Sequence, residues 1–246
     1  MMSDPTTSTP ARRPDGDGAV ERGDVVAVFG ARSDVGVSTI ASSLALALVS
    51  LGLGPVALAE VDPRAIRAHN SGGGTASGTR AAESALDTPT GDRLMFPGSD
   101  TGLTRREDGV WAFASSSRRA LALPDAKAVS VALDAMRARF GVIVADLEHQ
   151  VNERTLAAFD AADRIVMVTQ GSVPALRGTQ RVLRLCRRLN YPDEKMCVVV
   201  NCYDAPGSIP VVDIASILKR EVFWRVASGK SIDTSGLAEK LLTKRA

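Results

Sequence analysis

The residues with the clearest potential for chemistry form a loop at positions 30–39, with the sequence Gly-Ala-Arg-Ser-Asp-Val-Gly-Val-Ser-Thr. The loop follows an apolar segment at 25–29 and leads directly into another at 40–51. Phosphate-binding loops lie between a buried strand and a helix, because glycines let backbone N–H groups face the phosphates and the helix N-terminus adds positive charge. The sequence therefore predicts a phosphate-binding loop here.

The individual positions of this loop support only part of that chemistry. Gly36 supplies a tight turn, and Ser38 or Thr39 supplies a hydroxyl group that could hold Mg²⁺. Val37 stands where such a loop carries the lysine that pairs with the phosphates, and Asp34 adds a negative charge that opposes phosphate binding. We therefore expect residual nucleotide binding through backbone amides, and hydrolysis that is weak or absent.

The elements that position the loop alternate between apolar strands and amphipathic helices. This alternation predicts an α/β fold, a three-layer sandwich with a mostly parallel sheet and helices on both faces. Together with the phosphate-binding loop it indicates a P-loop NTPase-like fold. We expect strands at residues 24–30, 55–60, 110–114, 142–147, 164–169, 195–201 and 222–226, and helices at 36–51, 125–140, 153–161, 174–189, 211–219 and 232–244.

Two segments depart from this alternation. Residues 1–22 are rich in Pro, Gly, Ser and Thr without apolar periodicity, which predicts a disordered tail before one domain at 23–246. Residues 67–106 are rich in Gly and Ser and predict an insertion that is mostly a long loop, with one short helix at 80–86.

Composition narrows the class of protein. The formal net charge of +2 implies no obligatory nucleic-acid partner. Cys186, Cys197 and Cys202 lack metal-ligand spacing, so we expect reduced, apolar side chains. No apolar run reaches the roughly 18 residues of a membrane span, and the polar N-terminus is unlike a signal peptide. We therefore expect a cytoplasmic protein without a transmembrane segment.

Polar residues follow several of the predicted strands. In parallel sheets, ligands bind at the carboxyl ends of the strands, so we expect these residues to surround the loop. Asp146 is a candidate for Mg²⁺, although a strand-end Asp can also cap the following helix. Asn201 is a weaker candidate, because Asn is common where strands lead into turns. The strand-end residues are Glu60, Asp62, Asp146 and Asn201.

Aligned on Gly36, the loop resembles the deviant Walker A loop of the ParA and MinD ATPases, K-G-G-x-G-K-[ST]-T. The resemblance implies ATP or ADP with Mg²⁺ as cofactor and a homodimer in which the signature lysine, here Arg32, reaches across to the partner's nucleotide. The implied cofactor-binding residues are Arg32, Ser33, Asp34, Val35, Gly36, Val37, Ser38 and Thr39. Of these, Ser33, Asp34 and Val37 replace two glycines and a lysine.

Three further segments resemble the same superfamily. Residues 59–63, Ala-Glu-Val-Asp-Pro, are similar to its D-x-D-P segment, which implies that Asp62 lies near Mg²⁺ or the attacking water. Residues 142–147 resemble its Walker B strand, so Asp146 would orient Mg²⁺, and Asn201 would recognise adenine. The resemblance thus implies Ser38, Asp62 and Asp146 as metal ligands and Asp62 and Arg32 as catalytic residues.

Residues 168–177, 201–204 and 222–224 are similar to the CpaE/TadZ branch of bacterial pilus-assembly proteins. This resemblance implies a degenerate ATPase that acts as a positioning or assembly scaffold for a cell-envelope machine, a Tad/Flp-type pilus or secretion apparatus, at the inner membrane or cell pole. Two alternatives stay open. One is an active partitioning or septum-placement ATPase that binds DNA or membrane, and the other is a nucleotide-free interaction scaffold.

One helix carries a basic row. Its arginines follow one another at i, i+4, i+7 and i+11, which places them on one face, and no acidic residue of the helix neutralises them. We expect either a contact for DNA, acidic lipid or an acidic partner, or a solvated surface. The residues are Arg177, Arg181, Arg184 and Arg188.

The C-terminal helix at 232–244 is amphipathic and short. It lacks a large aromatic side chain, so packing against the core is favoured over a role at a membrane.

Overall fold

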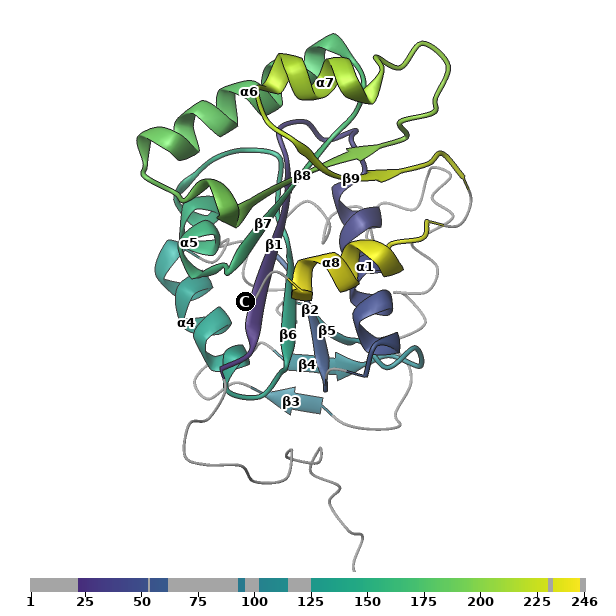
Figure 1. Cartoon of the computed structure of the whole chain (residues 1–246). Helices are drawn as coiled ribbons and strands as arrows, with labels where there is room; N and C mark the ends of the chain where they lie inside the picture. The colour runs from purple at the N-terminus through teal and green to yellow at the C-terminus, as the bar shows by residue number, and fades with distance from the viewer. Residues whose placement is uncertain are drawn as a thin grey trace, which may run out of the picture.

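A computed structural model describes residues 22–52, 54–61, 93–95, 102–114, 125–229 and 232–243. Among these residues the chain forms a nine-stranded sheet with the order β3-β4-β5-β2-β6-β1-β7-β8-β9 (Figure 1). The strands are β1 (Asp24–Gly30), β2 (Val56–Glu60), β3 (Arg93–Met95), β4 (Gly102–Arg105), β5 (Trp111–Ala114), β6 (Val142–Asp146), β7 (Arg164–Thr169), β8 (Met196–Asn201) and β9 (Val222–Val226).

The seven strands from β5 to β9 in this order are parallel, and helices cover both faces. The helices are α1 (Val37–Ser50), α4 (Ala126–Arg137), α5 (Glu153–Ala161), α6 (Val173–Arg188), α7 (Val211–Leu218) and α8 (Ser235–Thr243), with a short 3₁₀ helix at Asp193–Lys195. The α/β, P-loop NTPase-like sandwich predicted from the sequence is therefore confirmed.

The central strand β1 shows why both faces are covered. Its side chains alternate, so Val25, Ala27 and Phe29 belong to an apolar cluster with α4, α5, α6 and α7. Val26 and Val28 point the other way, into a cluster with α1 and α8. Figure 1 shows α1 and α8 on one side of the sheet and α4 and α5 on the other. β1 is thus buried on both faces of the sheet, and the loop that follows it lies in the middle of the carboxyl edge of the sheet.

The predicted strands and helices agree with the structure to within a few residues, with one correction. The prediction that residues 67–106 are mostly a loop is wrong for β3 and β4, which form an antiparallel hairpin beside β5. Backbone pairing holds β3 to β4 and β4 to β5, and these strands of three and four residues are too short to show an apolar period. The tail at 1–21, most of the insertion and the predicted helix at 80–86 lie outside the described residues.

The prediction that the C-terminal helix packs against the core is also confirmed. Leu237 and Leu241 of α8 are buried against α1 and the sheet, as expected for core packing. Cys186 and Cys197 are buried free thiols, and Cys202 is a half-buried one. Among the described helices, none is both long enough and apolar enough to cross a bilayer.

Candidate functional site

The predicted phosphate-binding loop connects β1 to α1 at the carboxyl edge of the sheet. Gly36 lies immediately before α1 with a left-handed backbone, φ 87°, which favours glycine. No side chain caps α1 and no acidic residue stands in its first turn, so the N–H groups of Val37, Ser38 and Thr39 remain donors at this end. The backbone part of an anion site is therefore present.

The lysine position of the loop is part of the apolar core. Val37 is 8% exposed and packs with Val35 over Gly30. A Cβ atom on Gly30 would lie 2.6 Å from one methyl group of Val37 and 2.5 Å from one of Val35. The side chain that replaces lysine therefore fills space between the sheet and α1 and brings no charge to the loop.

The loop neutralises its own arginine. Arg32 donates to Asp34 through two bonds, Nε to Oδ1 and Nη2 to Oδ2, both at 3.1 Å. The hydrogen bond from Arg32 lowers the pKa of Asp34, and the same contact raises the pKa of Arg32. Gln170, which follows β7, also donates to the backbone oxygen of Asp34 at 3.3 Å. Asp34 was predicted to weaken phosphate binding. In the structure it pairs with Arg32, the one positive side chain in residues 30–39 that could attract phosphate.

Asn201 lies inside the loop rather than beside it. Its side chain is 4% exposed, its Nδ2 donates to the backbone oxygen of Val35 at 3.0 Å, and its Oδ1 accepts from the N–H of Cys202 at 3.0 Å. A Cβ atom on Gly36 would lie 2.4 Å from this Nδ2. The Nδ2 of Asn201 therefore holds the loop against β8, and its Oδ1 fixes the carboxamide to the backbone that follows β8. Adenine recognition by Asn201 stays a prediction.

The proposed metal ligands are only partly gathered. Asp146 ends β6, is 6% exposed, and lies in register with Val28 of β1 and Glu60 of β2. Ser38 is exposed at the start of α1, and Asp62 lies outside the described residues. Within the described ranges, no group of three or more His, Cys, Asp or Glu side chains is placed to hold a metal ion.

A buried ion pair next to Asp146 was not predicted. Glu148, 5% exposed, accepts a hydrogen bond from Arg154 Nη2 at 2.6 Å and another from Asn152 Nδ2. Asn152 Oδ1 in turn accepts from the N–H of Thr155 at 3.0 Å and caps α5. An Asn directly before a helix predicts such a cap, but no sequence signal indicates that Glu148 and Arg154 pair.

The basic row on α6 lies on one face, as predicted. Arg177, Arg181, Arg184 and Arg188 are exposed, and the opposite face is buried. None of the four forms a hydrogen bond or ion pair with another described residue. Beside them, the Nε of Arg187 lies 3.8 Å from Oδ1 of Asp193.

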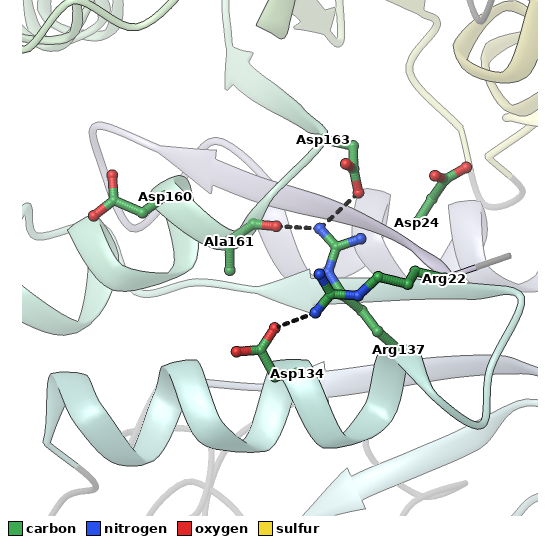
Figure 2. A pocket seen from close by; sticks show the side chains of 7 residues that line it. All are labelled: Arg22, Asp24, Asp134, Arg137, Asp160, Ala161 and Asp163. Atoms are coloured by element: carbon green, nitrogen blue, oxygen red, sulfur yellow. Dashed lines mark hydrogen bonds and ion pairs between the residues drawn. The ribbon is translucent and has the colours of Figure 1, made fainter. Parts of the chain in front are cut away.

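A cavity of about 500 Å³ lies at the opposite edge of the sheet (Figure 2). In it, Arg137 donates to the backbone oxygens of Gly23 and Ala161 and pairs with Asp163, which accepts from the N–H of Val25. These contacts join the starts of β1 and β7 to the ends of α4 and α5. We assign the cavity a structural role, because Arg137 uses its guanidinium to connect these strands and helices.

Comparisons with known proteins agree with the fold. No family model matches the chain. Two uncharacterized proteins of Mycobacterium tuberculosis, one from strain CDC 1551 and one from a second strain, are each 31% identical over 196 residues, 79% of this chain. The chain spans about half the length of these relatives, 52%.

Solved structures define the class of the fold. A ParA family ATPase of Chlorobium tepidum matches with a TM-score of 0.60 and 16% identity over 90% of this chain and 89% of that one. The septum site-determining protein MinD of Pyrococcus horikoshii, complexed with Mg-ADP, matches at 0.59 and 13% over 84% and 82%. The MinC:MinD cell division complex of Aquifex aeolicus matches at 0.60 and 18% over 90% and 88%. The chain has the P-loop NTPase fold of ParA and MinD ATPases.

The phosphate end of the loop does not fit a tightly held nucleoside triphosphate. Tight sites combine backbone donors with a cation, and here the cation position is the buried Val37 while Arg32 is engaged by Asp34. The donors that remain are the uncapped N–H groups of α1. The site can therefore offer an anion hydrogen bonds and a helix end, without a free positive side chain from the loop.

Proposed function

We propose that the chain is a ParA/MinD-fold scaffold that positions or assembles a cell-envelope machine and hydrolyses ATP slowly or not at all. The observation that carries this proposal is the loop, where Val37 is buried and Arg32 is paired with Asp34. Phosphoryl transfer relies on positive charge around the transferred group, and losing a cation removes several kcal/mol of stabilisation.

Weak binding of ATP or ADP with Mg²⁺ is part of the proposal. The N–H groups at the start of α1, the Ser38 hydroxyl and the Asp146 carboxylate are the groups that would hold it. Mg-ADP in a MinD of the same fold supports this choice of ligand. Because the loop is already held by Asn201 and Gln170, we propose that it keeps its shape without nucleotide.

The partners belong to the same proposal. We propose a homodimer, with Arg32 at the dimer face, that acts in the cytoplasm, at the inner membrane or at a cell pole. The similarity of residues 168–177 and 201–204 to pilus-assembly proteins supports a Tad/Flp-type pilus or secretion machine as the partner. A MinD of the same fold forms a complex with MinC, which supports a protein-binding role.

The test of slow hydrolysis is phosphate release by the purified chain with Mg-ATP, measured beside an ordinary ParA or MinD ATPase. We expect release at background level for the wild type. A wild-type rate near that of the ordinary ATPase would refute the proposal.

The positioning role is tested by imaging a fluorescent fusion in the source organism. We expect foci at the pole or envelope that persist in a variant with Ser38→Ala and Asp146→Asn. A signal that fills the cell evenly would contradict the role in positioning.

A DNA-binding partitioning ATPase is the second candidate, and the exposed arginine row of α6 favours it. DNA retention at low salt that disappears in the double variant Arg181→Glu with Arg184→Glu would support this candidate. Failure to bind DNA at low salt would remove it. A scaffold without any nucleotide is the third candidate, and the absence of heat on titration with Mg-ATP would favour it.

A further inference from the structure

The outer face of α6 is a straight basic row that nothing in the described chain covers. The row consists of Arg177, Arg181, Arg184 and Arg188, and its eleven steps of 1.5 Å from first to last make about 16 Å of helix. Val173 lies one turn before Arg177 on the same line and is 52% exposed. In Figure 1, α6 lies at the top of the molecule, with α7 next to it.

The folded chain gains little from this row. None of the four arginines pairs with another described residue, and like charges at i, i+3 and i, i+4 disfavour a helix. The helix contains no Asp or Glu that would offset them. Because these arginines destabilise their own helix, we expect them to bind a partner molecule of opposite charge.

The surroundings of the row favour a protein over DNA. At its C-terminal end, the Asp193 carboxylate pairs with Arg220 at 2.6 Å and lies 3.8 Å from Arg187 Nε, and exposed Glu194 follows it. Along its side, Gln180 donates to the backbone oxygen of Ile217 on α7, whose side chain is 41% exposed. A DNA duplex carries a charge about every 1.7 Å and would extend past the row towards the exposed carboxylate of Glu194. A partner helix of about three turns has the same length as the row. It would stop before Glu194 and could cover the exposed apolar residues Val173 and Ile217.

We propose that α6 docks an acidic α-helical segment of a partner protein. The segment carries Asp or Glu at the spacing of the arginine row and an apolar residue that packs on Val173. Arginine suits this contact, because its planar guanidinium forms two parallel hydrogen bonds with a carboxylate. The inference deepens the proposed scaffold function, since it names the chemistry of the partner. Its test does not involve the nucleotide loop, so the two proposals can fail separately.

The probes are two synthetic helical peptides of identical composition, and a mixed-sequence DNA duplex. One peptide carries glutamates in a single row at the spacing of the α6 arginines, and the other distributes the same glutamates around the helix. Binding to the full chain is measured by fluorescence anisotropy at low and high salt. We expect the row peptide to bind about tenfold more tightly than the distributed one, and to weaken with salt.

Two matched double variants distinguish the effect of the arginine row on binding from the effect of net charge. Arg181→Glu with Arg184→Glu should weaken the row peptide about tenfold or more. Lys127→Glu with Arg105→Glu makes the same change in charge at exposed residues of α4 and β4, away from α6 in Figure 1, and should leave binding within about twofold. Circular dichroism confirms that both variants are folded.

Three results would overturn the proposal. They are equal binding of the two peptides, equal loss in both double variants, and tighter binding of the DNA duplex than of the row peptide at the same salt. The last result would assign the row to nucleic acid.

Discussion

The contact between Asn201 and the loop gives a direct test of what this residue does. In Asn201→Ala, the hydrogen bonds to the backbone oxygen of Val35 and from the N–H of Cys202 are lost. Loss of the buried bond leaves the Val35 oxygen without a partner, which costs about 1–3 kcal/mol, and loss of the part-buried bond from Cys202 costs about 0.5–1.5 kcal/mol. The side chain is 4% exposed, so water reaches this position poorly. We expect the free energy of unfolding to fall by about 2–4 kcal/mol.

The assay is urea unfolding followed by circular dichroism without nucleotide, with the slope against urea checked for constancy. A decrease of this size lowers the melting midpoint by roughly 5–15 °C in a chain of this length. Asn201→Asp should destabilise at least as much, because it places a carboxylate against the Val35 carbonyl. The control is Ser38→Ala, an exposed change in the same loop, with an expected effect within about 0.5 kcal/mol.

Equal stability of Asn201→Ala and the Ser38→Ala control would contradict a structural role for Asn201. That outcome is expected of a residue that only contacts a ligand, because its loss leaves the free protein unchanged. It would return Asn201 to the role of an adenine-binding residue.

Three further outcomes follow from buried contacts. Arg154→Ala leaves the carboxylate of Glu148 buried without its cation and should destabilise by about 3 kcal/mol or more, measured by urea unfolding; a loss below about 1 kcal/mol would contradict the buried pair. In mass spectrometry after iodoacetamide treatment, Cys202 should react well before Cys186, because burial raises the pKa of the Cys186 thiol to about 11; equal rates in the native protein would contradict this. Gly171→Ala should destabilise by about 1–3 kcal/mol, because its Cβ would lie 2.8 Å from the backbone nitrogen of Ile209, in the loop before α7. An unchanged melting midpoint would contradict this, because it would show that the loop moves away without cost.

The central fold could be read from the sequence because each strand is short, apolar and separated from the next by a helix. β1, β7 and β9 begin and end where expected, and the alternation of strands and helices implies a parallel sheet. The β3–β4 hairpin was missed because backbone pairing, of β3 with β4 and of β4 with β5, holds its short strands. Backbone pairing of this kind leaves little trace in the side-chain pattern of three or four residues.

The candidate site was predicted in position and only partly in structure. The loop lies where the strand–turn–helix pattern places it, and Asn201 comes close to it because β8 ends at the same edge. The bond between Arg32 and Asp34 could not be foreseen, since residues two apart meet only if the turn brings them together. Likewise, Val37 reads as a missing lysine in the sequence, while the structure adds that it packs in the core.

We propose that the phosphate end of the loop lacks a free cation, and calorimetric titration with a non-hydrolysable ATP analogue and Mg²⁺ measures whether adding a cation strengthens binding. Val37→Lys restores the cation, and Val37→Met adds an uncharged chain as the control. We predict that the wild type and Val37→Met bind alike, and that Val37→Lys binds about tenfold or more tightly. Wild-type binding as tight as that of Val37→Lys would contradict the claim, because the loop would then hold phosphate without the lysine.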